Sequence, residues 1–336
     1  MKKETISAKM AICLLALAVF GTNSIMGITT VAKQDSWITF LIALVIVLPL
    51  VLIYARISKL FPEKNFDEIC DTLFGKVLSK VFQFIMLWYS MHLAALIIRN
   101  FTEYLGLSTL LQTPNLLIMI FITMACVYLA KSGVTVLGRW AVICLFLIIL
   151  LVLFTLILSI ENIELDNLKP FFSHSVKEMA DATFQIFGFP LAETVLYLMI
   201  IGNLKKGEST YKVWVCGLLL GALLIFVFLM KNRLVLGIYL DKVYYSSFVE
   251  ARVIKLSSYF TRIEGVITFS FIFAGITKAT ICLIAASKLF CSIIGEKQPN
   301  RIILPLSLIA MVISGLIYKN TSQMLEFIKV YKFYAS

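Results

Sequence analysis

The stretch ADATFQIFGFPLAETVLYLMIIGNL, residues Ala180–Leu204, decides the fold of this chain. It is long enough to cross a bilayer, because about 20 apolar residues at 1.5 Å each span the hydrocarbon core. Gly188-Phe189-Pro190 interrupts the helix in its middle, since proline has no N–H to donate and clashes with the preceding turn. Glu193 follows closely, and an ionisable group inside a membrane is costly unless it is paired, protonated or hydrated. A break beside a carboxylate favours a binding site; the alternative is a proline kink with a buried acid bonded to a neighbouring helix.

The composition is that of a polytopic membrane protein. Hydrophobic residues make up 60% of the chain and the mean hydropathy is +0.96, whereas soluble domains have about 45–50% apolar residues. The net charge of +11 does not indicate nucleic-acid binding, because the basic residues lie between the apolar runs, where cytoplasmic loops are expected. The seven cysteines lie mostly inside apolar runs without metal-ligand or disulfide spacing. No nucleotide-binding or nucleophile motif of soluble enzymes occurs, so we expect neither an enzyme nor a cofactor.

Apolar runs follow one another along the whole chain, which predicts a single all-α transmembrane domain over residues 1–336. The first run lacks a signal-peptide cleavage site and the next span follows almost at once. The nine runs are about Ala8–Val31, Trp37–Tyr54, Val81–Leu107, Asn115–Ala130, Trp140–Ile160, Ala180–Leu204, Val213–Met230, Val266–Ile294 and Ile302–Tyr318.

The loops between these runs alternate between rich and poor in lysine and arginine, which predicts a cytoplasmic N-terminus. Within a rich loop, Asn65–Lys76 is expected to form a short cytoplasmic helix that ends at Gly75. The long basic stretch Lys231–Glu264 falls outside by this count, although long loops obey the charge rule poorly. In it, Tyr244–Arg262 is expected to be an outer amphipathic segment lying on the bundle.

A second break lies in the first run, where FGTNSIMG, residues 20–27, places small polar residues and two glycines in an apolar helix. This break matches the one near Gly188 if the chain consists of two five-span halves, about 8–160 and 180–336. Matched interrupted segments are the best sequence pointer to the site of an inverted-repeat transporter. The alternative is a helix-packing face of small residues, but Gly21 and Gly27 do not have GxxxG spacing. Nine runs leave a tenth span unaccounted for, so we expect a truncated reading frame or fragment.

Several short motifs follow one another along the chain: Gln34-Asp35-Ser36-Trp37-Ile38, Phe61-Pro62 with Phe66, Leu73-Phe74-Gly75-Lys76, Arg99-Asn100-Phe101-Thr102-Glu103, Thr113-Pro114, Asn167-Leu168-Lys169-Pro170 and Phe187…Glu193. Their order, over essentially the whole chain, resembles the spore germination permease family. This family contains the B subunits of nutrient germinant receptors and belongs to the amino acid–polyamine–organocation superfamily; its members have ten spans. The resemblance implies an inner spore membrane protein that senses a small nutrient, typically an amino acid. It also implies an A subunit and a C lipoprotein subunit as partners, besides membrane lipid.

The expected ligand site lies between the two breaks. Backbone N–H groups of Ser24–Gly27, at the start of the outer half of the first span, would hold a carboxylate through the helix dipole. Carbonyl groups freed near Gly21 and near Phe187–Gly188 would accept from an amino group. The candidate ligand-binding residues are Gly21, Thr22, Asn23, Ser24, Gly27, Phe187, Gly188, Phe189 and Glu193.

Three further charged residues lie within apolar runs. Arg99 and Glu103 are four residues apart, share a helix face with His92 and are able to pair. Arg99 either snorkels to the nearby surface or forms part of an outer gate. Lys278 lies well inside Val266–Ile294; by the resemblance it would stand where sodium-coupled relatives hold a cation, and the alternative is a structural salt bridge, with Glu193 as a candidate partner.

Two functions remain open at this point. The first is the ligand-sensing B subunit of a germinant receptor. The second is an amino acid permease coupled to protons, in which Lys278 and Glu193 would be the coupling groups. A receptor descended from a transporter keeps the same site, so the residues alone do not separate the two.

The charge distribution predicts which loops are accessible from outside the cell. Single cysteines replacing Lys3, Lys64, Lys206 or Lys297 in a cysteine-free background should resist an impermeant thiol reagent, because these positions belong to the basic segments. Cysteines replacing Lys33, Lys169 or Lys319 should be labelled. Labelling of intact cells at Lys64 or Lys206 would contradict this topology and the division into repeats.

Overall fold

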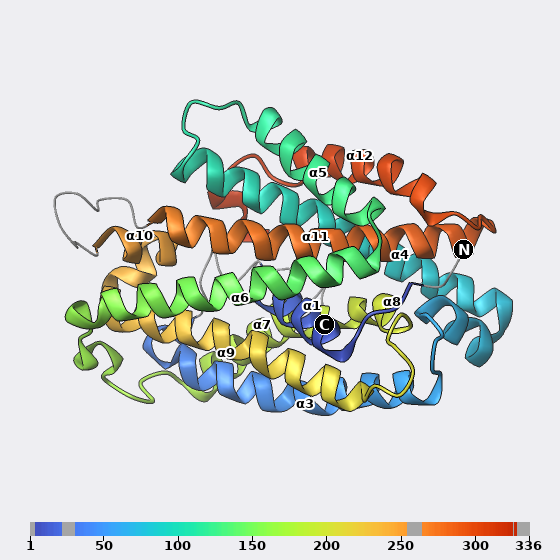
Figure 1. Ribbon diagram of the computed structural model, residues 1–336. Helices are drawn as coiled ribbons and strands as arrows, with labels where there is room; N and C mark the ends of the chain where they lie inside the picture. Colours follow the sequence, from blue (N-terminus) through green and yellow to red (C-terminus); the bar gives the residue numbers. More distant parts are fainter. Residues whose placement is uncertain (1–3, 22–30, 254–263, 325, 328–336) are drawn as a thin grey trace.

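The computed structural model describes residues 4–21, 31–253, 264–324 and 326–327, and the regular elements in these ranges are all helical (Figure 1). The main helices are α1 (Ala8–Phe20), α3 (Ser36–Leu60), α4 (Phe66–Ser108), α5 (Asn115–Lys131), α6 (Val134–Ser159), α7 (Val176–Ile186), α8 (Leu198–Ile201), α9 (Thr210–Leu236), α10 (Ser246–Val253), α11 (Glu264–Ile294) and α12 (Pro299–Ile317). Seven described stretches are long and apolar enough to cross a membrane, and α1 and α5 are shorter apolar helices. These helices coincide with the nine predicted runs and confirm an all-α polytopic bundle.

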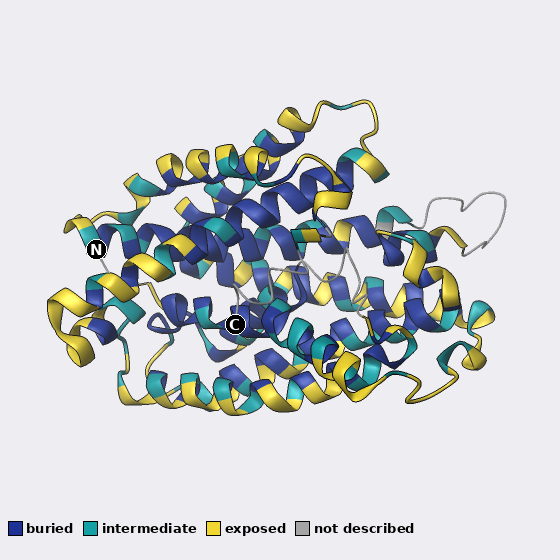
Figure 2. Ribbon diagram, turned by 180° about the vertical axis from the view of Figure 1, so that it is seen from behind, coloured by how far each residue is buried: buried dark blue, intermediate teal, exposed yellow. Residues whose placement is uncertain are grey.

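The degree of burial separates central from peripheral helices. In its most apolar 18-residue window, α11 has 78% of its residues buried, whereas α12 has 28%. Helix α1 lies in the centre as well and packs against α9, α6 and α11 (Figure 1). Exposed residues are concentrated on the outer helices (Figure 2), and those of α3 and α12 are largely aliphatic. An apolar exterior of this extent is what contact with lipid tails requires.

The predicted short helix after the second span is present. Asn65 begins it with a capping box, in which the Glu68 carboxylate accepts from the Asn65 N–H at 2.9 Å. Gly75, with φ of +72°, interrupts the helical backbone, and the chain then continues as the membrane-length part of α4. A positive φ is readily adopted only by glycine, so the kink occurs at this residue.

The sixth span is interrupted where the sequence predicts it. Helix α7 gives way to a wide turn over Phe187–Leu191, followed by the 3-10 helix Ala192–Tyr197 and then α8. Phe189 has an extended backbone (φ −135°, ψ 110°), and Pro190 has no N–H to continue the helical ladder. In the first span, α1 ends at Phe20, and the remainder of its predicted break lies outside the described residues.

One end of the bundle is fastened by backbone pairing between the start of the first span and the end of the sixth. The Ile6 N–H donates to the Asn203 carbonyl and the Lys205 N–H donates to the Ile6 carbonyl, each at 2.9 Å. The ammonium of Lys288, on α11, donates to the Met199 carbonyl at 2.8 Å and to Asn203 Oδ1 at 3.0 Å. We call this the Ile6 end of the bundle.

The opposite end, the α10 end, differs from the prediction. Helix α9 continues beyond Met230, so Lys231 is buried inside a helix rather than exposed in a long loop. The expected amphipathic surface segment is wrong over its described part, because α10 buries polar side chains. The reason is a buried partner: Lys231 Nζ lies 2.8 Å from Glu250 of α10, and Ser159 donates to Glu250 at 2.6 Å. Asn232 also donates to Ser247 at 2.8 Å.

The Lys231–Glu250 pair predicts a large stability effect when one partner is removed. Glu250→Gln leaves a buried ammonium without its counter-ion, which costs about 3–5 kcal/mol. Thermal unfolding in detergent should therefore occur at a clearly lower temperature. The double variant Lys231→Met/Glu250→Gln should recover part of the loss. Lys206→Gln, which removes an exposed pair with Glu63, is the control and should change stability by less than about 1 kcal/mol.

Candidate functional site

A buried ion pair joins the broken sixth span to α11. Lys278 Nζ donates to Glu193 Oε2, and the two side chains are only 4% and 3% exposed. Glu193 lies in the 3-10 helix directly after the wide turn, so the interrupted backbone places its carboxylate inside the bundle. Two charges removed from water must stay paired, since an unpartnered buried charge costs several kcal/mol. The pair therefore ties these two elements together.

The first span and the wide turn both contact the ammonium side chain. Lys278 Nζ lies 5.6 Å from the ring centroid of Phe189, within the range of a cation–π contact. A Cβ at Gly21 would lie 2.9 Å from Lys278 Cδ and 3.2 Å from its Cβ. Gly21 has a negative φ of −29°, so what it supplies is space for the lysine stem rather than a left-handed backbone. The structure thus brings together Gly21, Phe189, Glu193 and Lys278.

A small cavity lies at this pair, with a volume of about 10 Å³. That is room for about one water molecule. Its lining combines the two charged side chains with Ala18 of α1, Leu93 of α4 and Cys282 of α11. Side chains from both matched spans, the third span and the eighth span therefore meet at one point.

The other sequence-predicted ligand residues are placed differently. Phe187 and Gly188 form the wide turn, and the Phe187 carbonyl accepts from the Ala192 N–H. That carbonyl therefore already accepts one hydrogen bond and has one further lone pair with which to accept another. Thr22, Asn23, Ser24 and Gly27 lie outside the described residues.

Arg99 and Glu103 pair with each other but belong to a separate cluster. Arg99 Nη2 lies 3.1 Å from Glu103 and donates to the Lys319 carbonyl at 3.0 Å, while Thr321 donates to Glu103 at 3.0 Å. The Arg99 guanidinium also lies 5.3 Å from the Tyr318 ring centroid. Arg99 is 6% exposed, so it does not snorkel; the pair holds the segment after α12 against α4.

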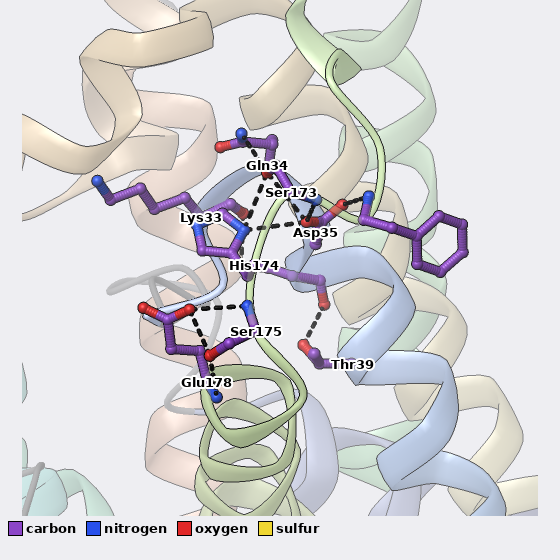
Figure 3. A network of polar contacts seen from close by, with 10 residues as sticks. Lys33, Gln34, Asp35, Thr39, Ser173, His174, Ser175 and Glu178 are labelled. Carbon is purple, nitrogen blue, oxygen red and sulfur yellow. Dashed lines mark hydrogen bonds and ion pairs between the residues drawn. The ribbon is translucent and has the colours of Figure 1, made fainter.

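Sequence reasoning missed a polar network at the α10 end, which Figure 3 shows. The Asp35 carboxylate is fully buried and accepts from the Phe172 N–H at 2.9 Å and from the Ser173 N–H at 3.0 Å. Its Oδ2 also lies 2.9 Å from His174 Nδ1. Gln34 donates to the Ser173 hydroxyl at 2.9 Å. Asp35 precedes α3, and Phe172–His174 precede α7, so this network joins the start of α3 to the segment before α7. The only signal for it was the motif Gln34-Asp35-Ser36-Trp37, whose partner segment is far away in sequence.

An interrupted span inside a bundle of membrane-length helices is typical of transporter-like folds. The chain belongs to the spore germination protein family, whose family model matches residues 5–324. This confirms the family resemblance of the motifs.

Two relatives from Bacillus subtilis (strain 168) illustrate the family relationship. Spore germination protein KB is 25% identical over 330 residues, which cover 97% of this chain and 88% of that protein. The putative spore germination protein YfkT is 24% identical over 309 residues, covering 89% of this chain and 82% of that protein.

Solved transporter structures share the fold. The crystal structure of MhsT in complex with L-phenylalanine has a TM-score of 0.62 at 13% identity, over 99% of this chain and 87% of that chain. An outward-open, substrate-bound Na⁺-coupled sialic acid symporter has a TM-score of 0.65 at 12% identity, over 99% of this chain and 75% of that chain. At this identity the likeness establishes the transporter-like fold.

The Asp35 network predicts a local effect of one substitution. Asp35→Asn replaces a carboxylate that accepts from two backbone N–H groups and faces His174 with an amide that has one acceptor oxygen. Hydrogen exchange at Phe172 and Ser173 should become faster by about tenfold, the factor for loss of roughly one charge-assisted hydrogen bond. Asp241→Asn, which alters the Arg233–Asp241 pair at the same end, should leave exchange at Phe172 and Ser173 unchanged. Equal rates in wild type and Asp35→Asn would contradict this role for the network.

Proposed function

We propose that this chain is the ligand-sensing B subunit of a nutrient germinant receptor and that its nutrient is an amino acid. Family membership and the similarity to spore germination protein KB support the receptor role. The MhsT structure holds L-phenylalanine on the same fold, which favours an amino acid as the ligand. The observation that carries the placement of the ligand is the buried Lys278–Glu193 pair at the interrupted sixth span, beside the end of α1.

The ligand would lie between the two interrupted spans. Backbone N–H groups of Ser24–Gly27 would hold its carboxylate, because N–H groups at a helix start attract anions. Thr22 and Asn23 would line the same cavity. Backbone carbonyls near Gly21 and Gly188 would accept from its ammonium group, and Phe187 and Phe189 would contact its side chain.

In the proposal, the ion pair responds to the ligand. The cavity beside it has room for about one water molecule, so a nutrient requires Lys278 or the surrounding helices to move. In this proposal, the ammonium group of Lys278 takes the place of the cation that a sodium-coupled transporter would bind from solution. The protein would then have two states, one with the Lys278–Glu193 pair and one in which the pair is rearranged. The ligand would shift the equilibrium towards the state that it binds more tightly, and the difference between its two affinities sets the size of the shift.

The membrane and the partners follow from the receptor role. The chain would span the inner spore membrane with its N-terminus in the cytoplasm, so that the Ile6 end faces the spore core and the α10 end faces outward. It would act together with an A subunit and a C lipoprotein subunit. The Arg99–Glu103 pair would then lie near the outer surface, where it fixes the segment after α12.

A second candidate is a proton-coupled amino acid permease that acts alone. The observation favouring it is the same buried pair, because ionisable residues that are paired inside a membrane-spanning bundle often belong to proton relays. The transporter-like fold is compatible with either function. Deletion of the gene distinguishes them: a receptor loss abolishes germination on a particular amino acid, while a permease loss abolishes uptake of that amino acid by growing cells and leaves germination intact.

The site predicts a defined pattern in nutrient dose–response curves. Gly21→Val drives a side chain into the space of the Lys278 stem, and Phe189→Ala removes the ring beside its ammonium. Each should raise the nutrient concentration for half-maximal germination by about tenfold or more, equivalent to roughly 1.4 kcal/mol of lost binding. Phe269→Ala on α11, an exposed ring, is the control. Unchanged dose–response curves for both site variants would place the ligand elsewhere.

The ion pair itself is tested by a double-mutant cycle on membrane abundance. Glu193→Gln leaves the Lys278 ammonium buried without a counter-ion, a loss of about 3–5 kcal/mol, so the variant should accumulate poorly. Lys278→Met in the same chain should partly restore its level. Normal accumulation of Glu193→Gln alone would mean that Glu193 is protonated or that the pair is not a charged one.

A further inference from the structure

Helices α5 and α12 lie side by side on the periphery of the bundle (Figure 1), and a groove of about 540 Å³ lies between them. Most of its lining is aliphatic: Ile120, Met124 and Val127 come from α5, and Leu304, Leu308 and Met311 from α12. Met124, Leu304 and Leu308 are exposed. The groove shares no lining residue with the cavity at the charge pair.

The polarity of the groove changes along its length. Its aliphatic part leads to Tyr128 and then to Lys131 and Ser132, where α5 ends. Tyr128 is 73% exposed, and tyrosines with an apolar ring and a polar tip are enriched at the membrane interface. Lys131 is exposed and closes the groove with a positive charge. An occupant must therefore be apolar over most of its length, amphipathic near its end and negatively charged at the end.

The length of the groove separates two kinds of occupant. Ile120 and Lys131 are eleven residues apart on α5, which corresponds to about 16 Å at 1.5 Å per residue. That is close to half of the roughly 30 Å hydrocarbon core, the depth of one leaflet. A transmembrane helix of a partner would need a face that crosses the whole core, with small residues that allow close approach. The groove has mainly branched aliphatic residues and methionines instead, and its two small residues, Thr123 and Ser132, both lie on α5 or at its end.

We infer that the groove between α5 and α12 binds one anionic glycerophospholipid, with an acyl chain along the aliphatic lining and the phosphate at Lys131. Basic pockets between transmembrane helices are known to hold anionic head groups. Tyr128 lies where the glycerol and ester region of the lipid would be. Lipid seated here would couple the positions of α5 and α12, which also pack together and against α11.

The experiment measures lipid retention by the full chain. The protein is reconstituted in vesicles of equal phosphatidylglycerol and phosphatidylcholine, extracted in mild detergent and examined by native mass spectrometry. We expect the wild type to retain phosphatidylglycerol over phosphatidylcholine by about fivefold, the factor for one lysine near an anionic surface. Lys131→Gln should lose this preference. Lys76→Gln, which removes an exposed lysine away from the groove, should keep it.

A second variant tests the apolar part of the groove. Val127→Trp fills it and should reduce retention of both lipids, whereas Val136→Trp, at an exposed position on α6, should not. Equal retention of the two lipids by the wild type, or an unchanged preference in Lys131→Gln, would overturn the inference. So would a photo-cross-linker at Val127 that joins the chain to another protein, including a second copy, in place of phosphatidylglycerol.

Discussion

Two opposite charges buried inside an apolar bundle must stay together, and the pair of Lys278 and Glu193 imposes that constraint on the centre of this protein. Each side chain is almost completely removed from water, so separating the charges without a substitute partner costs several kcal/mol. The carboxylate reaches the pair only because the sixth span is interrupted just before it. The aliphatic part of Lys278 fits only because Gly21, directly after α1, has no side chain. The break, the glycine and the charge pair thus depend on one another.

Two further sets of contacts hold the interrupted sixth span at its two ends. At the Ile6 end, backbone pairing of Ile6 with Asn203 and Lys205 joins the start of α1 to the end of the sixth span. At the α10 end, the Asp35 carboxylate accepts from the chain just before α7. A broken helix has fewer internal hydrogen bonds than a continuous one, so tertiary contacts have to fix its position.

The buried polar groups of the α10 end follow the same logic. Lys231 on α9 and Glu250 on α10 compensate each other's charge, and Ser159 of α6 donates a hydrogen bond to the carboxylate. Since the two charges are paired with each other rather than exposed to water, a helix that the sequence suggested would lie on the surface is instead docked into the bundle. Its position is set by these polar contacts together with the burial of Phe248 and Ala251, the former against the ring of Tyr104.

The sequence by itself determined the membrane class, the positions of the nine apolar runs, the break at Gly188-Phe189-Pro190 and the kink at Gly75. These features are local: hydropathy over about 20 residues, the missing N–H of proline and the backbone freedom of glycine act within a few turns of chain. The order of the motifs along the chain was also sufficient to identify the family.

Only the tertiary structure decided that Lys278 pairs with Glu193, that Arg99 and Glu103 hold the segment after α12, and that Asp35 binds the loop before α7. Their partners lie on other elements, often more than a hundred residues away. The order of charged residues along a sequence does not show which helices lie next to each other in space. The same reason explains the misplaced Lys231: its charge suggested a loop, but a buried carboxylate on another helix made the interior the favourable place.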